Sequence, residues 1–94
     1  MQNQYFMTSH AKKQFVERFY NALVQFEGKT VFDFFTDAVK ITVTDEKRGW
    51  IDYYFNKEIN AVFVLDRVKN TIITTFTPRD EVKYREAIFL SKGA

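Results

Sequence analysis

The stretch AVFVL, residues 61–65, is the longest uninterrupted run of apolar residues in this 94-residue sequence. A strand with one face in water alternates apolar and polar side chains, whereas a strand covered on both faces does not. The run is too short for a buried helix, and turn-forming segments flank it at 56–58 (NKE) and 66–70 (DRVKN). It therefore predicts a central strand that is buried on both faces.

The segments beyond those two turns also have strand composition. Residues 50–55 (WIDYYF) are rich in aromatic side chains, and residues 71–77 (TIITTFT) are rich in β-branched ones. Pro78 ends the second of these segments because it cannot donate to a ladder. Turns this short join antiparallel neighbours, so both segments are expected to pair with residues 61–65.

A fourth strand is predicted further upstream. Val39, Ile41 and Val43 alternate with polar residues, which is typical of a strand with one wet face. A turn at 45–49 (DEKRG) separates this segment from the aromatic one. The four segments together predict an antiparallel sheet in which residues 61–65 are interior.

Helical periodicity precedes the sheet. From a cap at Thr8 or Ser9, apolar residues recur at steps of three and four as far as Gly28, a residue suited to the left-handed end of a helix. These apolar positions are Ala11, Phe15, Phe19, Ala22, Leu23 and Phe26. A second, short helix is predicted at 30–38 and a closing helix at 80–90. The predicted fold is a two-layer α+β domain: N-terminal helices packed on a four-stranded antiparallel sheet, with a short C-terminal helix.

Length and composition limit the class of protein. Residues 1–94 are expected to form one domain, whose small core is enriched by 11 Phe, 5 Tyr and 1 Trp. The absence of cysteine excludes disulfides and fits a reducing cytoplasm. No apolar run approaches the roughly 18 residues of a membrane span, and the first twenty residues lack a secretory pattern. We therefore expect a cytoplasmic protein with no membrane association.

Metal and cofactor chemistry is not expected. One histidine and no cysteine give no ligand set with plausible spacing, and three separated glycines cannot form a phosphate-binding loop. A Ser-His-Asp triad would need Ser9 as nucleophile, but Ser9 is better explained as a helix cap.

The lone histidine, His10, lies on a helical wheel nearly opposite the stripe of Phe15 and Phe19, and close to Lys13. One interpretation is a solvated surface residue. The other is a general base, because a neutral imidazole accepts protons and free amides at a helix start attract phosphate. The residues themselves leave both interpretations open.

Basic residues favour one end of the predicted sheet. In a four-strand meander the first and third turns lie at the same end, which would gather four cations suited to RNA phosphates. These are Lys47, Arg48, Arg67 and Lys69. Trp50, Tyr53 and Tyr54 could stack on bases or belong to the core. The net charge of +2 and pI near 8.9 permit an RNA partner without requiring one.

The first helix carries a family resemblance. The pattern His10-Ala11-x-x-Gln14-Phe15-x-Glu17-Arg18 resembles the first helix of small RelE-like domains, His-Ala-x-x-Arg-apolar-x-Glu-Arg. These domains are similar to the wider barnase–EndoU–colicin–RelE (BECR) superfamily of ribonucleases, many from phages and toxin systems. Residues 72–78 (IITTFTP) resemble the family's Thr/Ser-x-aromatic signature near a proline, and the hairpin at 62–66 also looks similar. The resemblance implies N-terminal helices before a four-stranded antiparallel sheet.

The resemblance also implies a site and an activity. His10, Arg18 and Thr74 would be the catalytic residues of metal-independent RNA cleavage, which needs a base for the 2′-hydroxyl and donors for the developing charge. Gln14 replaces the family's arginine, and Lys13 would supply the missing charge. The expected function is therefore an RNA-engaging, RelE-like domain, with ribonuclease toxin as its catalytic form. Two alternatives stay open: a non-catalytic phage or mobile-element protein that inhibits a host protein, and a homodimer paired through a sheet edge or through the aromatic second strand.

Overall fold

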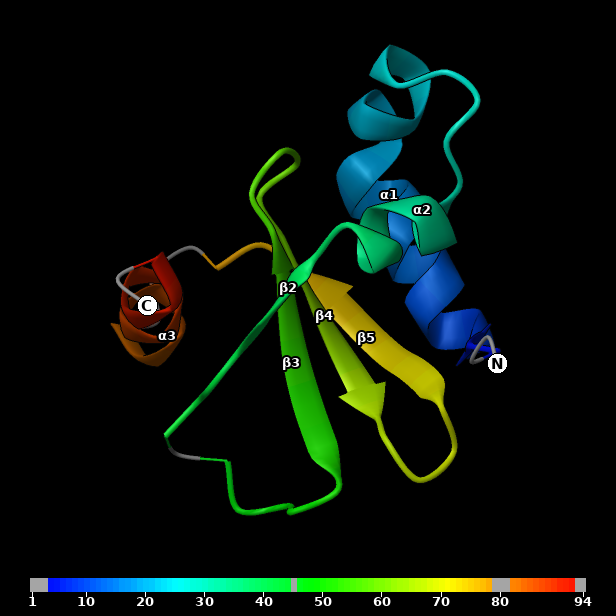
Figure 1. Cartoon of the computed structure of the whole chain (residues 1–94). Coiled ribbons are helices and arrows are strands. Elements are labelled where there is room, and N and C mark those ends of the chain that lie inside the picture. The colour runs from blue at the N-terminus through cyan, green and yellow to red at the C-terminus, as the bar shows by residue number, and fades with distance from the viewer. Residues whose placement is uncertain (1–3, 45, 79–81, 93–94) are drawn as a thin grey trace.

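The computed structural model describes residues 4–44, 46–78 and 82–92 and is an α+β fold (Figure 1). Its elements in chain order are β1 (Phe6–Met7), α1 (Ser9–Gln25), α2 (Val31–Thr36), β2 (Val39–Ile41), β3 (Ile51–Asn56), β4 (Ala61–Asp66), β5 (Thr71–Phe76) and α3 (Val82–Lys92). All four predicted strands and all three predicted helices are present, with ends that differ by a few residues. Asp80, the expected start of the last helix, lies outside the described residues.

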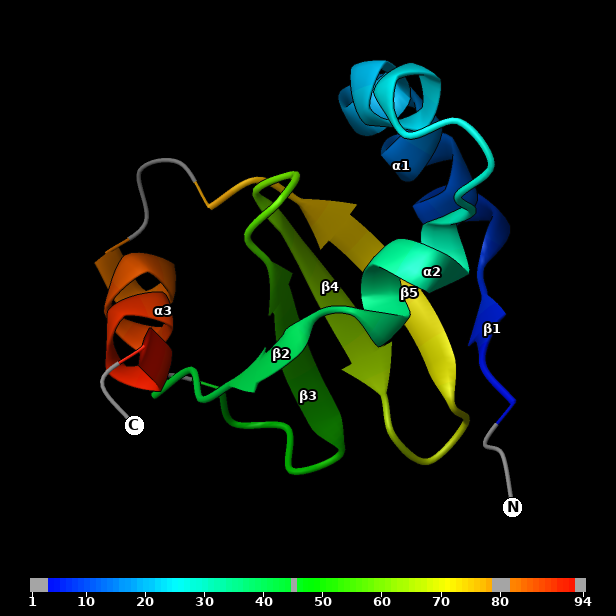
Figure 2. The ribbon, with the colours of Figure 1, turned by 45° about the horizontal axis from the view of Figure 1, so that its top comes forward.

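The sheet has the strand order β1-β5-β4-β3-β2, so the AVFVL strand is its middle strand, as predicted. β2, β3, β4 and β5 form the expected antiparallel meander. The prediction of four strands was incomplete, because β1 adds a fifth that runs parallel to β5 (Figure 2). The Phe6 N–H donates to the Asn70 carbonyl at 2.8 Å, and the Thr8 N–H to the Ile72 carbonyl at 3.1 Å. Two residues are too few to produce a periodic signal in the sequence.

The side chains of β4 divide between two cores. Ala61, Phe63 and Leu65 face α1 and α2, whereas Val62 and Val64 face α3, and none is more than 3% exposed. Figure 1 shows the sheet with α1 and α2 on one side and α3 on the other. The predicted two-layer arrangement was therefore wrong: α3 forms a third layer. β4 is an uninterrupted apolar run because helices cover both faces of the sheet at this strand.

Aromatic rings fill the core between the sheet and the N-terminal helices. The Phe15 ring lies 5.0 Å from that of Phe19, 6.1 Å from that of Phe34 and 6.0 Å from that of Phe63. Such pairs add about 0.5–1.5 kcal/mol beyond the area that they bury. The predicted buried stripe of α1 is thus confirmed for its central residues.

Local signals set the ends of the first two helices. Thr8 Oγ1 accepts the Ala11 N–H at 3.0 Å, which confirms Thr8 as the cap of α1. The helix ends at Gln25, before the predicted Gly28, which adopts φ +92° in the following turn. Thr30 and Asp33 form a reciprocal capping box at the start of α2.

The outer strand β2 departs from the predicted burial pattern. Ile41 and Val43 are buried as expected, but Val39, the first residue of this edge strand, is 59% exposed. β3 pairs with both β2 and β4, so its backbone is already used. A homodimer that uses this aromatic second strand stays a prediction.

Candidate nucleic-acid interface

The loop between β2 and β3 contacts the turn between β4 and β5. The Arg67 N–H donates to the Trp50 carbonyl at 2.8 Å, and Arg67 Nη2 donates to the Gly49 carbonyl. Both connections lie at the bottom of the view in Figure 1. The prediction that the first and third turns share one end of the sheet is confirmed. We call the group at this end the hairpin-end surface: Lys40, Lys47, Arg48, Trp50, Arg67 and Lys69.

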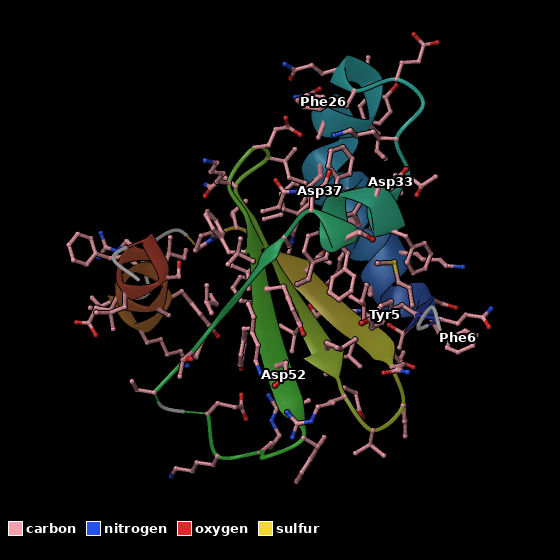
Figure 3. All side chains as sticks on the ribbon, viewed as in Figure 1. Tyr5, Phe6, Phe26, Asp33, Asp37 and Asp52 are labelled. Carbon is pink, nitrogen blue, oxygen red and sulfur yellow. The ribbon has the colours of Figure 1, made fainter. Side chains whose placement is uncertain are left out.

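A shielded carboxylate holds the first arginine of this surface. Asp52, at the loop end of β3 in Figure 3, has a side chain only 9% exposed. Its Oδ1 accepts from Arg67 Nη1 at 2.8 Å and lies 3.7 Å from Lys40 Nζ. A carboxylate this buried needs a cationic partner to offset its lost hydration. The Arg67 side chain is 53% exposed, so the cation faces solvent while the anion beneath it does not.

The second arginine is held in the same way. Arg48 binds Glu46 through two side-chain nitrogens, Nε at 2.8 Å and Nη2 at 3.1 Å, and through its backbone N–H at 2.9 Å. The Tyr53 hydroxyl also donates to Glu46. The side chain of Glu46 is 14% exposed and that of Arg48 is 49% exposed. Again the guanidinium is the outer member of the pair.

These contacts change the acidity of the two groups that hold Arg48. The hydrogen bonds from the Arg48 side chain, followed by that from Tyr53, lower the pKa of Glu46 to about 2. Burial, followed by the hydrogen bond to the Glu46 carboxylate, raises the pKa of the Tyr53 phenol. Glu46 is therefore ionised, and Tyr53 a neutral donor, throughout the neutral pH range.

The remaining members of the surface are open to solvent. Lys47 and Lys69 are exposed, and Asp66 accepts the Val68 and Lys69 N–H groups within the β4–β5 turn. Trp50 is 47% exposed. Five cations thus lie among three described carboxylates, Glu46, Asp52 and Asp66, the first two of which are shielded.

The other two aromatic candidates for base stacking are used by the fold. Tyr53 is buried, and the Tyr54 ring packs edge-on against Phe35 with centroids 5.0 Å apart. Burial, followed by the charge of Asp52, raises the pKa of the Tyr54 phenol. Trp50 is the member of this group that a base could reach.

The residues suggested as catalytic lie elsewhere, along the seam between α1 and β5. The Thr74 hydroxyl donates to Gln14 Oε1, and Arg18 Nη1 donates to the Thr75 carbonyl at 2.8 Å. The structure brings Arg18 and Thr74 to this one seam, where both bind protein groups. His10 is exposed in the first turn of α1, eight residues before Arg18, which is about 12 Å along a helix axis.

His10 is thus on the wet side of α1, as the helical wheel predicted, and it is not brought together with Arg18. Lys13 is also exposed on α1 and makes no hydrogen bond or ion pair to the seam among the described residues. The buried Thr75 hydroxyl beside the seam has no hydrogen-bond partner within the described structure. The seam therefore holds polar groups, but no assembled base and nucleophile.

Glu46, Asp52 and Lys40 are members of the site that the sequence reasoning missed. Asp52 was the more visible signal, since a carboxylate inside an aromatic strand has to find a partner. Glu46 gave no such signal, because an acidic residue in a turn is ordinarily solvated. Lys40 was read only as a polar residue in the alternating strand.

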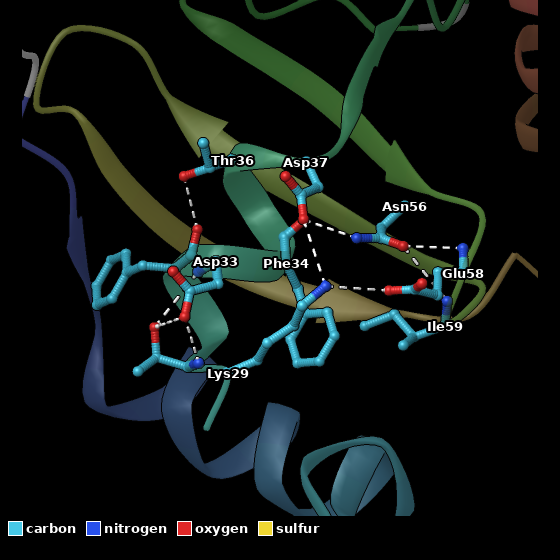
Figure 4. A network of polar contacts seen from close by, with 10 residues as sticks. Lys29, Asp33, Phe34, Thr36, Asp37, Asn56, Glu58 and Ile59 are labelled. Carbon is cyan, nitrogen blue, oxygen red and sulfur yellow. Dashed lines mark hydrogen bonds and ion pairs between the residues drawn. The ribbon is translucent and has the colours of Figure 1, made fainter. Parts of the chain in front are cut away.

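A separate polar network closes α2 onto the β3–β4 turn (Figure 4). Asn56, which is buried, donates to the Phe34 carbonyl at 2.8 Å and accepts the Glu58 N–H at 2.9 Å. Lys29 Nζ lies 3.4 Å from Glu58 and 3.6 Å from Asp37. Partial burial lowers the pKa of Lys29, but the hydrogen bond and charge of Glu58, together with Asp37, raise it overall. One cation and two carboxylates take part, and the contacts join α2 to the β3–β4 turn, so we assign the network to structure.

Within the described ranges, no cluster of three metal-ligating side chains is present. None of the helices described is both long and apolar enough to cross a membrane. No protein-family model, curated protein or solved structure matches this chain. The RelE-like resemblance of the first helix and last strand therefore stays a prediction.

Proposed function

We propose that this protein binds single-stranded RNA through the hairpin-end surface. The observation that carries the proposal is the pair of half-exposed guanidiniums, Arg48 and Arg67, each fixed by a shielded carboxylate beside the exposed Trp50. A fixed guanidinium loses little side-chain entropy when it binds a phosphate. It has five N–H donors, so those that Glu46 or Asp52 leave unused are available to the ligand.

The indole supplies the second part of the recognition. Stacking of a base on an aromatic side chain is worth about 1–3 kcal/mol and is open to single strands, whose bases are not already stacked in a duplex. Cations on the β2–β3 loop and on the β4–β5 turn would bind phosphates of the RNA backbone while Trp50 stacks on a base. This arrangement favours binding with little sequence preference.

Fluorescence gives a direct test, because Trp50 is the single tryptophan of the chain. Titration with a short oligoribonucleotide should quench its emission. With Lys47, Arg48, Arg67 and Lys69 on phosphates, the logarithm of the affinity should fall with the logarithm of salt concentration with a slope of about −3. Unchanged emission together with salt-independent affinity would contradict the proposal.

Charge reversal with a matched control locates the surface. Lys69→Glu should weaken binding and make the salt slope less steep by about 0.7 or more. Lys57→Glu carries the same charge change at the opposite end of the sheet, in the β3–β4 turn, and should leave the slope unchanged. Equal effects of the two substitutions would mean that net charge, and not this surface, attracts RNA.

We propose binding without cleavage. Arg18 and Thr74 hydrogen-bond to protein groups, and His10 lies two helical turns from Arg18. Labelled RNA incubated with the protein in the presence of a chelator should stay intact. RNA cleavage that falls about 10²–10⁴-fold on His10→Ala would instead support the ribonuclease interpretation.

Protein binding is a second candidate, favoured by an exposed apolar stripe on α1. Val16, Tyr20 and Val24 recur every four residues and are 50%, 61% and 61% exposed. Stripes with this spacing fit apolar grooves of partner proteins. If host-protein inhibition is the function, induced expression should arrest bacterial growth. The arrest should be lost in Val16→Lys/Val24→Lys and kept in Lys69→Glu.

A further inference from the structure

Helix α3 has apolar residues on both of its faces. Tyr84, Ala87 and Ile88 pack toward the sheet, where they contact residues of β2, β3 and β5. On the opposite side, Val82, Phe89 and Leu90 are 55%, 75% and 65% exposed. Large apolar side chains that are exposed together on one face often mark a contact surface. Figures 1 and 2 show α3 as the outermost layer on its side of the sheet.

The outer face of α3 also carries two opposite charges. Arg85 and Glu86 lie between Val82 and Phe89, and these residues together with Leu90 line a shallow hollow of about 460 Å³. The spacing places them all on one side of the helix. The face is thus an apolar patch with one cation and one anion near its middle.

We propose that this face is covered by α3 of a second copy of the chain, in an antiparallel pair about a two-fold axis. In an isologous contact the same patch serves both copies and must be complementary to itself. One register sets Arg85 opposite Glu86 of the second copy. The two-fold axis repeats this contact, so two ion pairs form. That register also sets Val82 opposite Phe89 of the second copy.

The charges favour a second copy of the chain over other occupants, and the antiparallel orientation over the parallel one. A parallel pair would set each arginine against an arginine and each glutamate against a glutamate, which is destabilising. An anionic lipid surface would repel Glu86 and leave it without a partner. A second copy in the antiparallel register satisfies both charges and buries the three apolar side chains.

The dimer should be reversible and of modest affinity. Aromatic side chains such as Phe bury about 150–250 Å² each, so one helix face per copy gives a contact near the lower limit of specific interfaces, about 1,000 Å² in total. Dissociation is therefore expected in the micromolar range. The α3 face and the hairpin-end surface are different parts of the molecule, so the dimer is independent of the proposed RNA binding.

Sedimentation over a series of protein concentrations tests the proposal. The wild-type chain should pass from monomer to dimer as concentration rises. Phe89→Lys should raise the dissociation constant by about 30-fold or more, as expected of a central aromatic anchor. Val16→Lys makes a similar change at an exposed position of α1 and should leave the dimer intact. A wild-type chain that stays monomeric at several hundred micromolar would overturn the proposal.

Charge-exchange variants test the register and need no substitution of a large apolar residue. Arg85→Glu alone and Glu86→Arg alone should each weaken the dimer, because each brings like charges together. The double variant Arg85→Glu/Glu86→Arg should restore it, and an equimolar mixture of the two single variants should form a heterodimer. If the double variant is no tighter than the single ones, the antiparallel register is wrong.

Discussion

Asp52 and Glu46 show how a buried charge can organise an exposed one. Each carboxylate is shielded and each is bound by an arginine whose side chain is about half exposed. Exposed ion pairs ordinarily contribute only about 0–1 kcal/mol to stability. The larger effect here is geometric, since the anions fix the positions of two guanidiniums at one end of the sheet.

The ionised side chain of Glu46 should make the stability of the fold depend on pH. Because its folded pKa is lowered to about 2, its contribution to stability is present above the ordinary carboxyl value of 4.5 and is lost as pH falls through about 2. Glu46→Gln should therefore lower the free energy of unfolding by about 1–2 kcal/mol at pH 7. The gap between variant and wild type should narrow between pH 4.5 and pH 2, as measured by urea unfolding at each pH.

Glu17→Gln serves as the control for this experiment, because Glu17 is exposed on α1. A substitution of that kind usually changes stability by less than about 0.5 kcal/mol. A pH-independent gap between Glu46→Gln and wild type would mean that the side chain contributes by packing and not by charge.

The sequence predicted those helices and strands that are long enough for their hydrophobic pattern to repeat. The buried stripe of α1 and the six-residue strands β3, β4 and β5 are long enough to display their period. β1 has two residues and displays none. The third layer was implied by the double-sided run of β4 but was not deduced, because the weakly periodic α3 does not indicate which face it covers.

The candidate site was predictable only in part, for a related reason. Meander topology alone places the first and third turns at one end of the sheet, so the cations were correctly grouped. The contact between Arg67 and Asp52 spans fifteen residues and depends on strand register and side-chain direction. Neither can be read from local composition.

Asn56 joins α2 to the β3–β4 turn, so its loss should destabilise the packing of these two elements. It is 3% exposed and bonds the Phe34 carbonyl and the Glu58 and Ile59 N–H groups. Asn56→Ala leaves these groups without their partner, and each buried polar group so affected costs about 1–3 kcal/mol. Urea unfolding should show that the free energy of unfolding falls by about 2 kcal/mol or more.

Lys29→Met is the matched comparison within the same network. Its ion pairs with Asp37 and Glu58 are partly exposed, so the loss of stability should be clearly smaller than that caused by Asn56→Ala. Equal losses for the two substitutions would mean that the exposed charges, and not the buried amide, hold α2 in place.

For the whole molecule, the shared strands of the sheet join two cores into one folding unit. β4 contributes Phe63 to the core beneath α1 and Val64 to the core beneath α3. Loss of packing in one core therefore removes support from strands that also form a wall of the other core. A domain of this size is stable by only about 5–15 kcal/mol, so a large cavity in either core should affect the entire fold.

Two large-to-small substitutions, one in each core, test this coupling. Phe15→Ala should cost about 3–5 kcal/mol and Ile88→Ala about 2–5 kcal/mol, the second toward its lower limit because Ile88 is 9% exposed where Phe15 is 1% exposed. Trp50 emission reports on the hairpin end and far-ultraviolet circular dichroism on the helices, most of which lie on the α1 side. If the cores are coupled, both signals should follow one urea transition in each variant, and Ile88→Ala should shift the helix signal although α1 is in the other layer. A separate early transition in Ile88→Ala, with the α1 signal retained, would show that α3 and its core unfold independently of the rest.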